Sequence, residues 1–223
     1  MWTLCVLAAL AADPAPEVRI VTLGDSITRG VRPGVEAKDT FQVQLETLLT
    51  EKKKTVKVIN VGIGGERTDQ GLARLARVLA AHKPHIVAIM YGHNDSHIDR
   101  GKTEPRLTAA QYEANLRKII QALQDARVQP VLMTPPCYAK KSRQGGVAEN
   151  PNVQLVKCAE VVRALARELK LPLIDHYAHW HRRLDDGDDT AAWTTDLYHP
   201  NRAGHAEIAA TMLPVLLKLL DRK

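Results

Sequence analysis

The chain alternates between short apolar runs and longer stretches in which apolar residues recur every three or four positions. Short runs that are rich in β-branched residues are typical of buried parallel strands. The runs that predict strands are residues 18–23, 56–61, 85–91, 128–134 and 171–174. Helical spacing predicts helices within residues 72–79, 116–123, 155–169 and 203–220.

Strands that alternate with helices of this length predict right-handed crossovers and an α/β fold, a three-layer α/β/α sandwich. The sequence has no internal repeat, low-complexity tract or linker, so residues 18–223 are predicted to form a single domain. A chain of 223 residues with 45% hydrophobic content can bury one sizeable core. Three irregular loops, at 29–38, 96–107 and 135–151, lie after the strands, at the edge where open α/β sheets bind ligands.

Residues 1–12 carry no charge and end in Leu10-Ala11-Ala12, which is typical of the apolar region and cleavage site of a secretory signal peptide. The segment is too short to span a bilayer, which requires about 20 apolar residues. A signal peptide or its remnant, and hence a secreted or periplasmic protein, is therefore predicted. The alternative is an N-terminal tail that frays or packs on the domain. In an exported protein, Cys137 and Cys158 either form a disulfide or remain two buried thiols.

The net charge of +6 comes from basic residues that are scattered along the predicted helices. Pairs such as Arg74 with Arg77 and Arg163 with Arg167 indicate solvated helix faces, and no basic block is interleaved with aromatic residues. A nucleic-acid partner is therefore not expected.

Four short motifs carry the candidate chemistry, each of them after a predicted strand or before the last helix. They are Gly24-Asp25-Ser26-Ile27, Asn60-Val61-Gly62-Ile63-Gly64-Gly65, Gly92-His93-Asn94-Asp95 and Asp196-Leu197-Tyr198-His199-Pro200. On its own, Ser26 is better explained by a helix cap or turn than by a nucleophile.

A base and its orienting carboxylate are available near the end of the chain. A serine hydroxyl needs an adjacent base that is held in one tautomer, and Asp196 lies three residues before His199, close enough to hold its imidazole. Pro200 and Asn201 are predicted to begin the last helix, with Asn201 as its N-cap. Taken alone, a histidine in this position is more often a surface residue.

Three groups are candidate donors to a developing oxyanion: the backbone N–H of Ser26, the backbone N–H of Gly65 and the side-chain amide of Asn94. The glycines at 62–65 do not match a dinucleotide-binding loop, because the third glycine of that pattern falls on Arg67. The alternative for Asn94 is an Asx-turn that closes the preceding strand.

The order and spacing of these four motifs resemble those of the SGNH hydrolases, also called GDSL-type esterases, over roughly residues 18 to 215. The resemblance implies a five-stranded parallel sheet in the flavodoxin-like order 2-1-3-4-5, with Ser26, Asp196 and His199 as catalytic residues. Ile27 stands where the family has leucine, a conservative apolar change. His93 occupies the variable position of the third motif, where it either contacts the substrate or has no role.

A cluster of His176, His179 and His181 beside Asp175 superficially suggests a metal site. Its spacing fits no standard zinc site, and the segment, followed by an acidic loop at 181–195, is predicted to be solvated. No metal and no cofactor are therefore expected.

The predicted function is a serine esterase that acts through an acyl-enzyme on Ser26, with a small-molecule or glycan ester as its partner. The loops carry Arg29, Arg32 and Lys38 on one side and Lys140, Lys141 and Arg143 on the other, with Phe41 and Tyr138 as the nearest aromatic residues. Loops this polar favour a short acyl group such as acetyl on a carbohydrate, and the cations favour an anionic polysaccharide. The alternatives are a lysophospholipase or thioesterase for longer acyl chains, and a non-catalytic carbohydrate- or lipid-binding relic of the fold.

Overall fold

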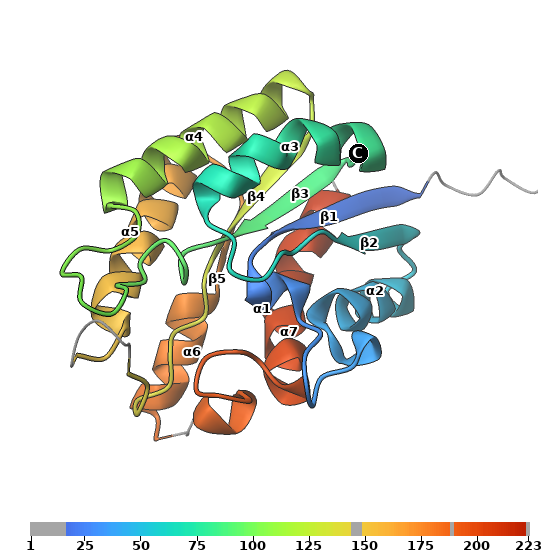
Figure 1. The fold of residues 1–223 in the computed structure, drawn as a ribbon. Helices are drawn as coiled ribbons and strands as arrows, with labels where there is room; N and C mark the ends of the chain where they lie inside the picture. The colour runs from blue at the N-terminus through green and yellow to red at the C-terminus, as the bar shows by residue number, and fades with distance from the viewer. Residues whose placement is uncertain (1–16, 144–148, 188–189, 222–223) are drawn as a thin grey trace, which may run out of the picture.

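The computed structural model describes residues 17–143, 149–187 and 190–221, and it has a central sheet of five parallel strands. The spatial order is β2-β1-β3-β4-β5, which confirms the α/β class and the flavodoxin-like order (Figure 1). The strands are β1 Val18–Gly24, β2 Val56–Asn60, β3 Ile86–Met90, β4 Gln129–Thr134 and β5 Leu173–Asp175. In the register of the sheet, Ile20 of β1 lies between Val58 of β2 and Ile86 of β3.

Helices cover both faces of the sheet because the side chains of each central strand alternate between two cores. Ile20 packs into one core with Phe41 and Met212, whereas Val21 packs into the other core with Leu116. The first core lies under α2 Phe41–Glu51, α6 His176–Asp185 and α7 Arg202–Leu220. The second lies under α3 Thr68–His82, α4 Ala109–Asp125 and α5 Asn152–Glu168. Figure 1 shows α3 and α4 on one side of the sheet and α2 and α7 on the other.

Three short helical segments complete the described chain and lie in its loops. They are α1 Ser26–Arg29, η1 Ala37–Asp39 and η2 Thr190–Trp193.

The segment expected to be a solvated histidine cluster and an acidic loop is instead helix α6, which runs as far as Asp185. Burial of Trp180 anchors this helix in the core, and His176 at its first position is also fully buried. The prediction of a solvated segment was therefore wrong for His176. Phe41, expected near the catalytic loops, is also buried at the start of α2 and faces His205.

Several expectations fall wholly or partly on residues outside the described ranges. The predicted signal peptide at 1–12 lies outside them, as do parts of the loops at 135–151 and 181–195. Among the described helices, α7 alone is long and apolar enough to cross a membrane by length and composition. A third of its apolar stretch is buried within the fold, where it packs against the first core, and core helices commonly pass the same test.

Candidate active site

Ser26 lies at the carboxyl end of β1, where Gly24 lets the chain turn sharply into α1. A Cβ on Gly24 would overlap the Thr28 hydroxyl and the Met90 carbonyl oxygen, so only glycine fits this close approach. The N-cap of α1 is Asp25, whose Oδ1 accepts a hydrogen bond from the Ile27 N–H at 2.9 Å. Ser26 therefore begins the helix but does not cap it, and its hydroxyl is available for other contacts.

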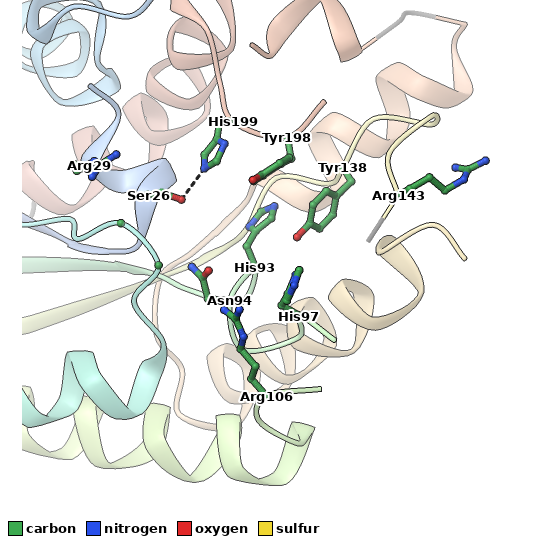
Figure 2. A pocket seen from close by; sticks show the side chains of 12 residues that line it. Ser26, Arg29, His93, Asn94, His97, Arg106, Tyr138, Arg143, Tyr198 and His199 are labelled. Carbon is green, nitrogen blue, oxygen red and sulfur yellow. Dashed lines mark hydrogen bonds between the residues drawn. The ribbon is translucent and has the colours of Figure 1, made fainter. Parts of the chain in front are cut away.

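The structure brings Ser26, His199 and Asp196 together in one hydrogen-bonded chain. Ser26 Oγ lies 2.8 Å from His199 Nε2 (Figure 2), and His199 Nδ1 lies 2.8 Å from Asp196 Oδ2. Asp196 Oδ1 also accepts the backbone N–H of His199 at 2.9 Å. With Asp196 ionised, Nδ1 holds the ring proton, so Nε2 is left to accept the serine proton.

The turn that carries Asp196 and His199 is fixed at both ends. Thr194 and Pro200 form an isolated antiparallel bridge, and the Ala139 N–H donates to the Leu197 carbonyl at 2.8 Å. Asn201 caps α7 by accepting the N–H groups of Ala203 and Gly204, as the sequence predicts. The histidine therefore sits on a short turn held by a long core helix.

Burial and the neighbouring charges together set the pKa values of His199 and Asp196. Burial lowers the pKa of His199 below its usual 6.5, and the cations Arg32 and Arg29 add to this, against the pull of Asp196. Burial works against the charge of Asp196, but hydrogen bonds from His199 and the charge of Arg32 outweigh it, so the pKa of Asp196 falls below 3.8. Near neutral pH the arrangement therefore favours an ionised carboxylate beside a neutral imidazole.

The candidate oxyanion donors line the same cavity as Ser26 and His199. Asn94 follows β3, and its Nδ2 donates to the Glu66 carbonyl at 3.2 Å and to Asp25 Oδ2 at 3.4 Å. These partners lie on other segments, which is not the local pattern of an Asx-turn. Gly65 has a φ of 77°, a left-handed conformation that glycine adopts without strain, and its Cα faces open space.

A buried network that the sequence did not reveal supports these donors. Glu66 pairs with Arg74 and accepts the Tyr91 hydroxyl at 2.6 Å, while Asp95 accepts the backbone and side chain of Thr68 at 2.8 and 2.6 Å. The network ties the loop after β2 to the loop after β3. Its only signal in the sequence is the third motif's Asp95, because the other members lie on separate elements.

Asp25 belongs to this buried layer and has only 1% of its surface exposed. Burial and the neighbouring carboxylates Asp95 and Glu66 raise its pKa to about 7. The carboxyl group that holds both α1 and the Asn94 amide therefore titrates near neutral pH.

The cavity around Ser26 has a volume of about 530 Å³. Its described lining residues are Ser26, Arg29, Gly64, Gly65, His93, Asn94, His97, Arg106, Tyr138, Arg143, Tyr198 and His199 (Figure 2). Arg106 is paired with Asp99 at 2.7 Å, and no lining residue in the described ranges is itself acidic.

His93 is 4% exposed and packs against Tyr138 and Tyr198, with ring centroids 4.7 and 6.3 Å away. Burial lowers the pKa of His93 to about 3, and the backbone of Pro136 opposes this only in part, so the ring is neutral. Apart from this contact with the Pro136 backbone, neither ring nitrogen has a hydrogen-bond partner among the described residues. Buried polar groups without a good partner are exceptional in folded proteins, so His93 is a candidate for a functional contact.

The expected loop cations separate into two groups. Arg29 and Arg143 line the cavity, but Arg32 pairs with Asp196 and Lys38 pairs with exposed Glu36. Lys140 and Lys141 are exposed and do not line the cavity.

The three histidines of the suspected metal cluster have separate partners. His176 Nδ1 lies 2.8 Å from the Thr211 hydroxyl, His179 pairs with Glu207, and His181 pairs with Asp185. Within the described ranges, no group of three or more histidine, cysteine or acidic residues is placed to hold a metal ion.

Of the two alternatives for the cysteines, the structure shows buried free thiols. Cys137 and Cys158 are unbonded, and burial raises the pKa of Cys137 to about 12. Both thiols are therefore protonated near neutral pH and poorly reactive.

The parallel sheet in the order β2-β1-β3-β4-β5, with a serine at the end of β1 hydrogen-bonded to a histidine–aspartate pair, is the arrangement expected of an SGNH hydrolase. Residues 22–207 match the model of the GDSL-like lipase/acylhydrolase family, so the chain belongs to this family and is a carboxylic ester hydrolase. This assignment, together with the intact contacts at Ser26, decides against a non-catalytic relic.

Two curated relatives and one solved structure illustrate the similarity. The chain is 29% identical to "Thioesterase 1/protease 1/lysophospholipase L1" of Escherichia coli K12, over 98% of this chain and 90% of the relative. It is 26% identical to "Acetylxylan esterase" of Geobacillus stearothermophilus, over 87% and 92% of the two chains. The crystal structure of a lipase/acylhydrolase from Enterococcus faecalis superposes with a TM-score of 0.75 at 26% identity, covering 92% of this chain and 98% of that one.

Proposed function

We propose that Ser26 is the nucleophile of this esterase, with His199 as its general base and Asp196 as the group that orients the base. Ser26 Oγ attacks the ester carbonyl carbon while His199 Nε2 takes the hydroxyl proton. The tetrahedral intermediate collapses, the C–O bond to the alcohol breaks, and His199 returns the proton to the leaving oxygen. Water then attacks the acyl-enzyme by the same route and releases the acid.

The negative oxygen of each tetrahedral intermediate is held by the backbone N–H groups of Ser26 and Gly65 and by the Asn94 amide. This role is supported by their position on one cavity with the Ser26–His199 pair. Backbone donors that are already oriented need no rearrangement as the charge develops, and for this reason such groups contribute much of the rate. The Asn94 amide donates both hydrogens to Glu66 and Asp25 in the free enzyme, so it exchanges the longer contact, with Asp25, for the oxyanion.

We propose that the substrate is a short-chain ester, most simply an acetyl ester of a carbohydrate. The observation that carries this proposal is the cavity lining: among its described residues none has an aliphatic side chain. A buried methylene contributes about 0.8 kcal/mol only when it leaves water for an apolar surface. Here that surface comes from tyrosine and histidine rings and from the stems of arginines, not from an aliphatic channel, which suits an acetyl group better than a long acyl chain.

The same cavity has features that suit a polar alcohol. Tyr198 is partly exposed and packs on the buried ring of Tyr138, with ring centroids 5.3 Å apart, so the apolar face of a sugar ring can pack against Tyr198. His93 lies beside both rings, and although both of its ring nitrogens are buried in the free enzyme, a small movement of Tyr198 would let one of them donate to or accept from a hydroxyl group. His93 is therefore assigned to substrate binding.

The test is kcat/KM on p-nitrophenyl esters from acetate to laurate, together with acetate release from acetylated glycans. We expect a maximum at acetate or propionate and release of acetate from at least one glycan. A His93→Phe variant retains the ring's packing but removes both nitrogens, so it should lose glycan hydrolysis more than p-nitrophenyl acetate hydrolysis.

The competing function is a lysophospholipase or thioesterase, as the name of the E. coli relative includes. A maximum at octanoate or longer esters, without acetate release from any glycan, would replace the acetylesterase proposal by this one.

Export of the protein is a separate proposal that depends on the uncharged residues 1–12. Fractionation of the native host and N-terminal sequencing of the recovered protein test it. An intact N-terminus in the cytoplasmic fraction would contradict export.

A further inference from the structure

The loop between α1 and η1 carries an arginine that contacts Asp196. Arg32 and Val35 form an isolated bridge across a tight turn in which Gly34 has a φ of 84°. From this turn, Arg32 Nη2 donates to Asp196 Oδ2 at 2.6 Å. Asp196 Oδ2 is also the oxygen that lies 2.8 Å from His199 Nδ1. One carboxylate oxygen therefore serves both the arginine and the proposed base.

We propose that Arg32 is a positioning residue for the reaction: it fixes the Asp196 carboxylate and draws part of its negative charge away from His199, so that the imidazole stays neutral at lower pH. This proposal rests on the roles given above to Ser26, His199 and Asp196.

The geometry supports the positioning part. Asp196 Oδ1 is held by the His199 N–H, while Oδ2 is held from one side by His199 and from the other by Arg32. Charge-assisted bonds of this length are among the stronger hydrogen bonds in proteins. The Arg32 side chain is 22% exposed, and its Nε is buried without a partner among the described residues, so Asp196 is the contact that compensates its burial.

The electrostatic part follows from the charges around His199. The titratable and charged groups that face it are Arg29 from α1, Arg32 from the next loop, His93 from the loop after β3, and Asp196 and Tyr198 from its own turn. His93 is neutral because burial lowers its pKa to about 3. Asp196 is thus the nearby anion that favours a protonated His199, and Arg32 offsets it at the shared oxygen.

Arg32 was expected to be a substrate-binding cation, but it does not line the cavity and its Nη2 is bound to Asp196. The alternative is that the contact between Arg32 and Asp196 only holds their two loops together. The two roles differ in one measurable way: a structural tie affects how much enzyme is folded, whereas a charge beside the base moves the pH at which activity appears.

The experiment compares pH profiles of kcat/KM for the wild type and Arg32→Gln, with Lys38→Gln as the matched control. Lys38 is a cation near the same loop that pairs only with exposed Glu36 in the described structure. Because kcat/KM reports ionisations of the free enzyme, its acid limb includes the pKa of His199. Asp25 also titrates near neutral pH, but it is unchanged in every variant compared, so a difference between the limbs reports on His199. Removal of Arg32 raises that pKa, so we expect the limb of Arg32→Gln to move up by about half a pH unit. We also expect a plateau kcat about three- to tenfold lower, because Asp196 loses one of its anchors.

Arg32→Lys retains the charge but not the planar guanidinium, so its limb should stay near that of the wild type while its plateau falls. If Arg32→Gln does not fold, Arg32→Met, which retains an unbranched apolar stem, is measured in its place. Lys38→Gln should match the wild type in both respects.

The role of Arg32 is overturned if the folded Arg32→Gln or Arg32→Met variant has its acid limb at the same pH as the wild type. It is also overturned if Lys38→Gln shifts the limb by the same amount. Failure of the underlying mechanism is distinguishable, because in that case Ser26→Ala would retain hydrolysis whatever the Arg32 variants do.

Discussion

The Asn94 amide nitrogen is held by the Glu66 carbonyl and by Asp25 Oδ2. Both contacts use the amide nitrogen, which the mechanism assigns to the oxyanion. The proposed role of Asn94 can therefore be tested by changing either Asn94 itself or the acceptor Asp25.

The first test changes the donor. Asn94→Ala should reduce kcat by about 10²–10³ with a smaller effect on KM, since the amide acts chiefly in the transition state. Asn94→Asp should be at least as impaired, because a carboxylate supplies no donor and repels the developing charge. Steady-state kinetics on p-nitrophenyl acetate measure both parameters. An effect confined to KM would assign Asn94 to binding of the substrate's ground state.

The second test changes an acceptor, with Asp25→Asn. Because the folded-state pKa of Asp25 is about 7 and the reference value is 3.8, the folded state disfavours its ionisation. The wild type therefore loses stability as pH rises between these two values. Asp25→Asn carries no charge to desolvate, so its Tm relative to the wild type should be higher at about pH 8 than at about pH 5.

Activity should change in the opposite direction in Asp25→Asn. The new amide either presents a donor to the Asn94 amide nitrogen or turns and gives up the Ile27 N–H, so kcat should fall even where the variant is the more stable protein. A constant Tm difference across the pH range would show that Asp25 does not titrate near neutrality.

At the scale of elements, the site depends on how the last helix begins. Asn201 accepts two N–H groups at the start of α7, and its Nδ2 donates to the Ala192 carbonyl at 2.7 Å. It lies two residues after His199, so the cap also sets the position of the catalytic turn.

Asn201→Ala should destabilise the protein by about 1 kcal/mol and also lower kcat severalfold. Thr108→Ala is the matched control, because Thr108 caps α4 through the Gln111 N–H and does not line the cavity. Urea unfolding and steady-state kinetics on both variants give the comparison. Equal stability losses with unchanged kcat in both variants would limit Asn201 to a structural role.

Most elements were predictable because their burial follows a simple period. Strands β1 to β4 were located to within one or two residues, and β5 begins two residues later than predicted. Helix α2 was not predicted, because Gln42 is buried and Val43 exposed, which breaks its apolar face. Helix α6 was missed because a buried histidine and Trp180 replace the aliphatic residues of an ordinary core face.

The site was predictable to the extent that it consists of local motifs. Ser26, Asn94, Asp196 and His199 were identified from short segments. The structure places Ser26, Asn94 and His199 on one cavity, with Asp196 hydrogen-bonded to His199. The Arg32–Asp196 pair joins residues 164 positions apart. No spacing rule predicts such a contact, so it required the folded chain.

For the whole molecule, the sheet topology gathers the loops after several strands and the final turn at one edge. The cavity formed there has Arg29, Arg106 and Arg143 among its described lining residues and no acidic lining residue. Clefts lined by one sign of charge raise the local concentration of oppositely charged substrates.

An acetyl ester of an anionic sugar should therefore lose kcat/KM as ionic strength rises, whereas p-nitrophenyl acetate should be nearly insensitive. Arg143→Gln should weaken this salt dependence, and Arg202→Gln, an exposed arginine outside the cavity, should not. Equal salt dependence for the two substrates would show that the cations do not select an anionic alcohol.

The most direct test of the mechanism is covalent labelling by a fluorophosphonate, located by peptide mass spectrometry and followed alongside the hydrolysis of p-nitrophenyl acetate. We expect the wild type to carry a single adduct on Ser26 and to lose activity in proportion to labelling. Ser26→Ala should fold, take up no label and lose nearly all hydrolysis, while Ser96→Ala, which removes another buried serine near this edge, should be labelled as the wild type is. Hydrolysis by Ser26→Ala at the wild-type rate, or an adduct on a different residue, would contradict the assignment of Ser26.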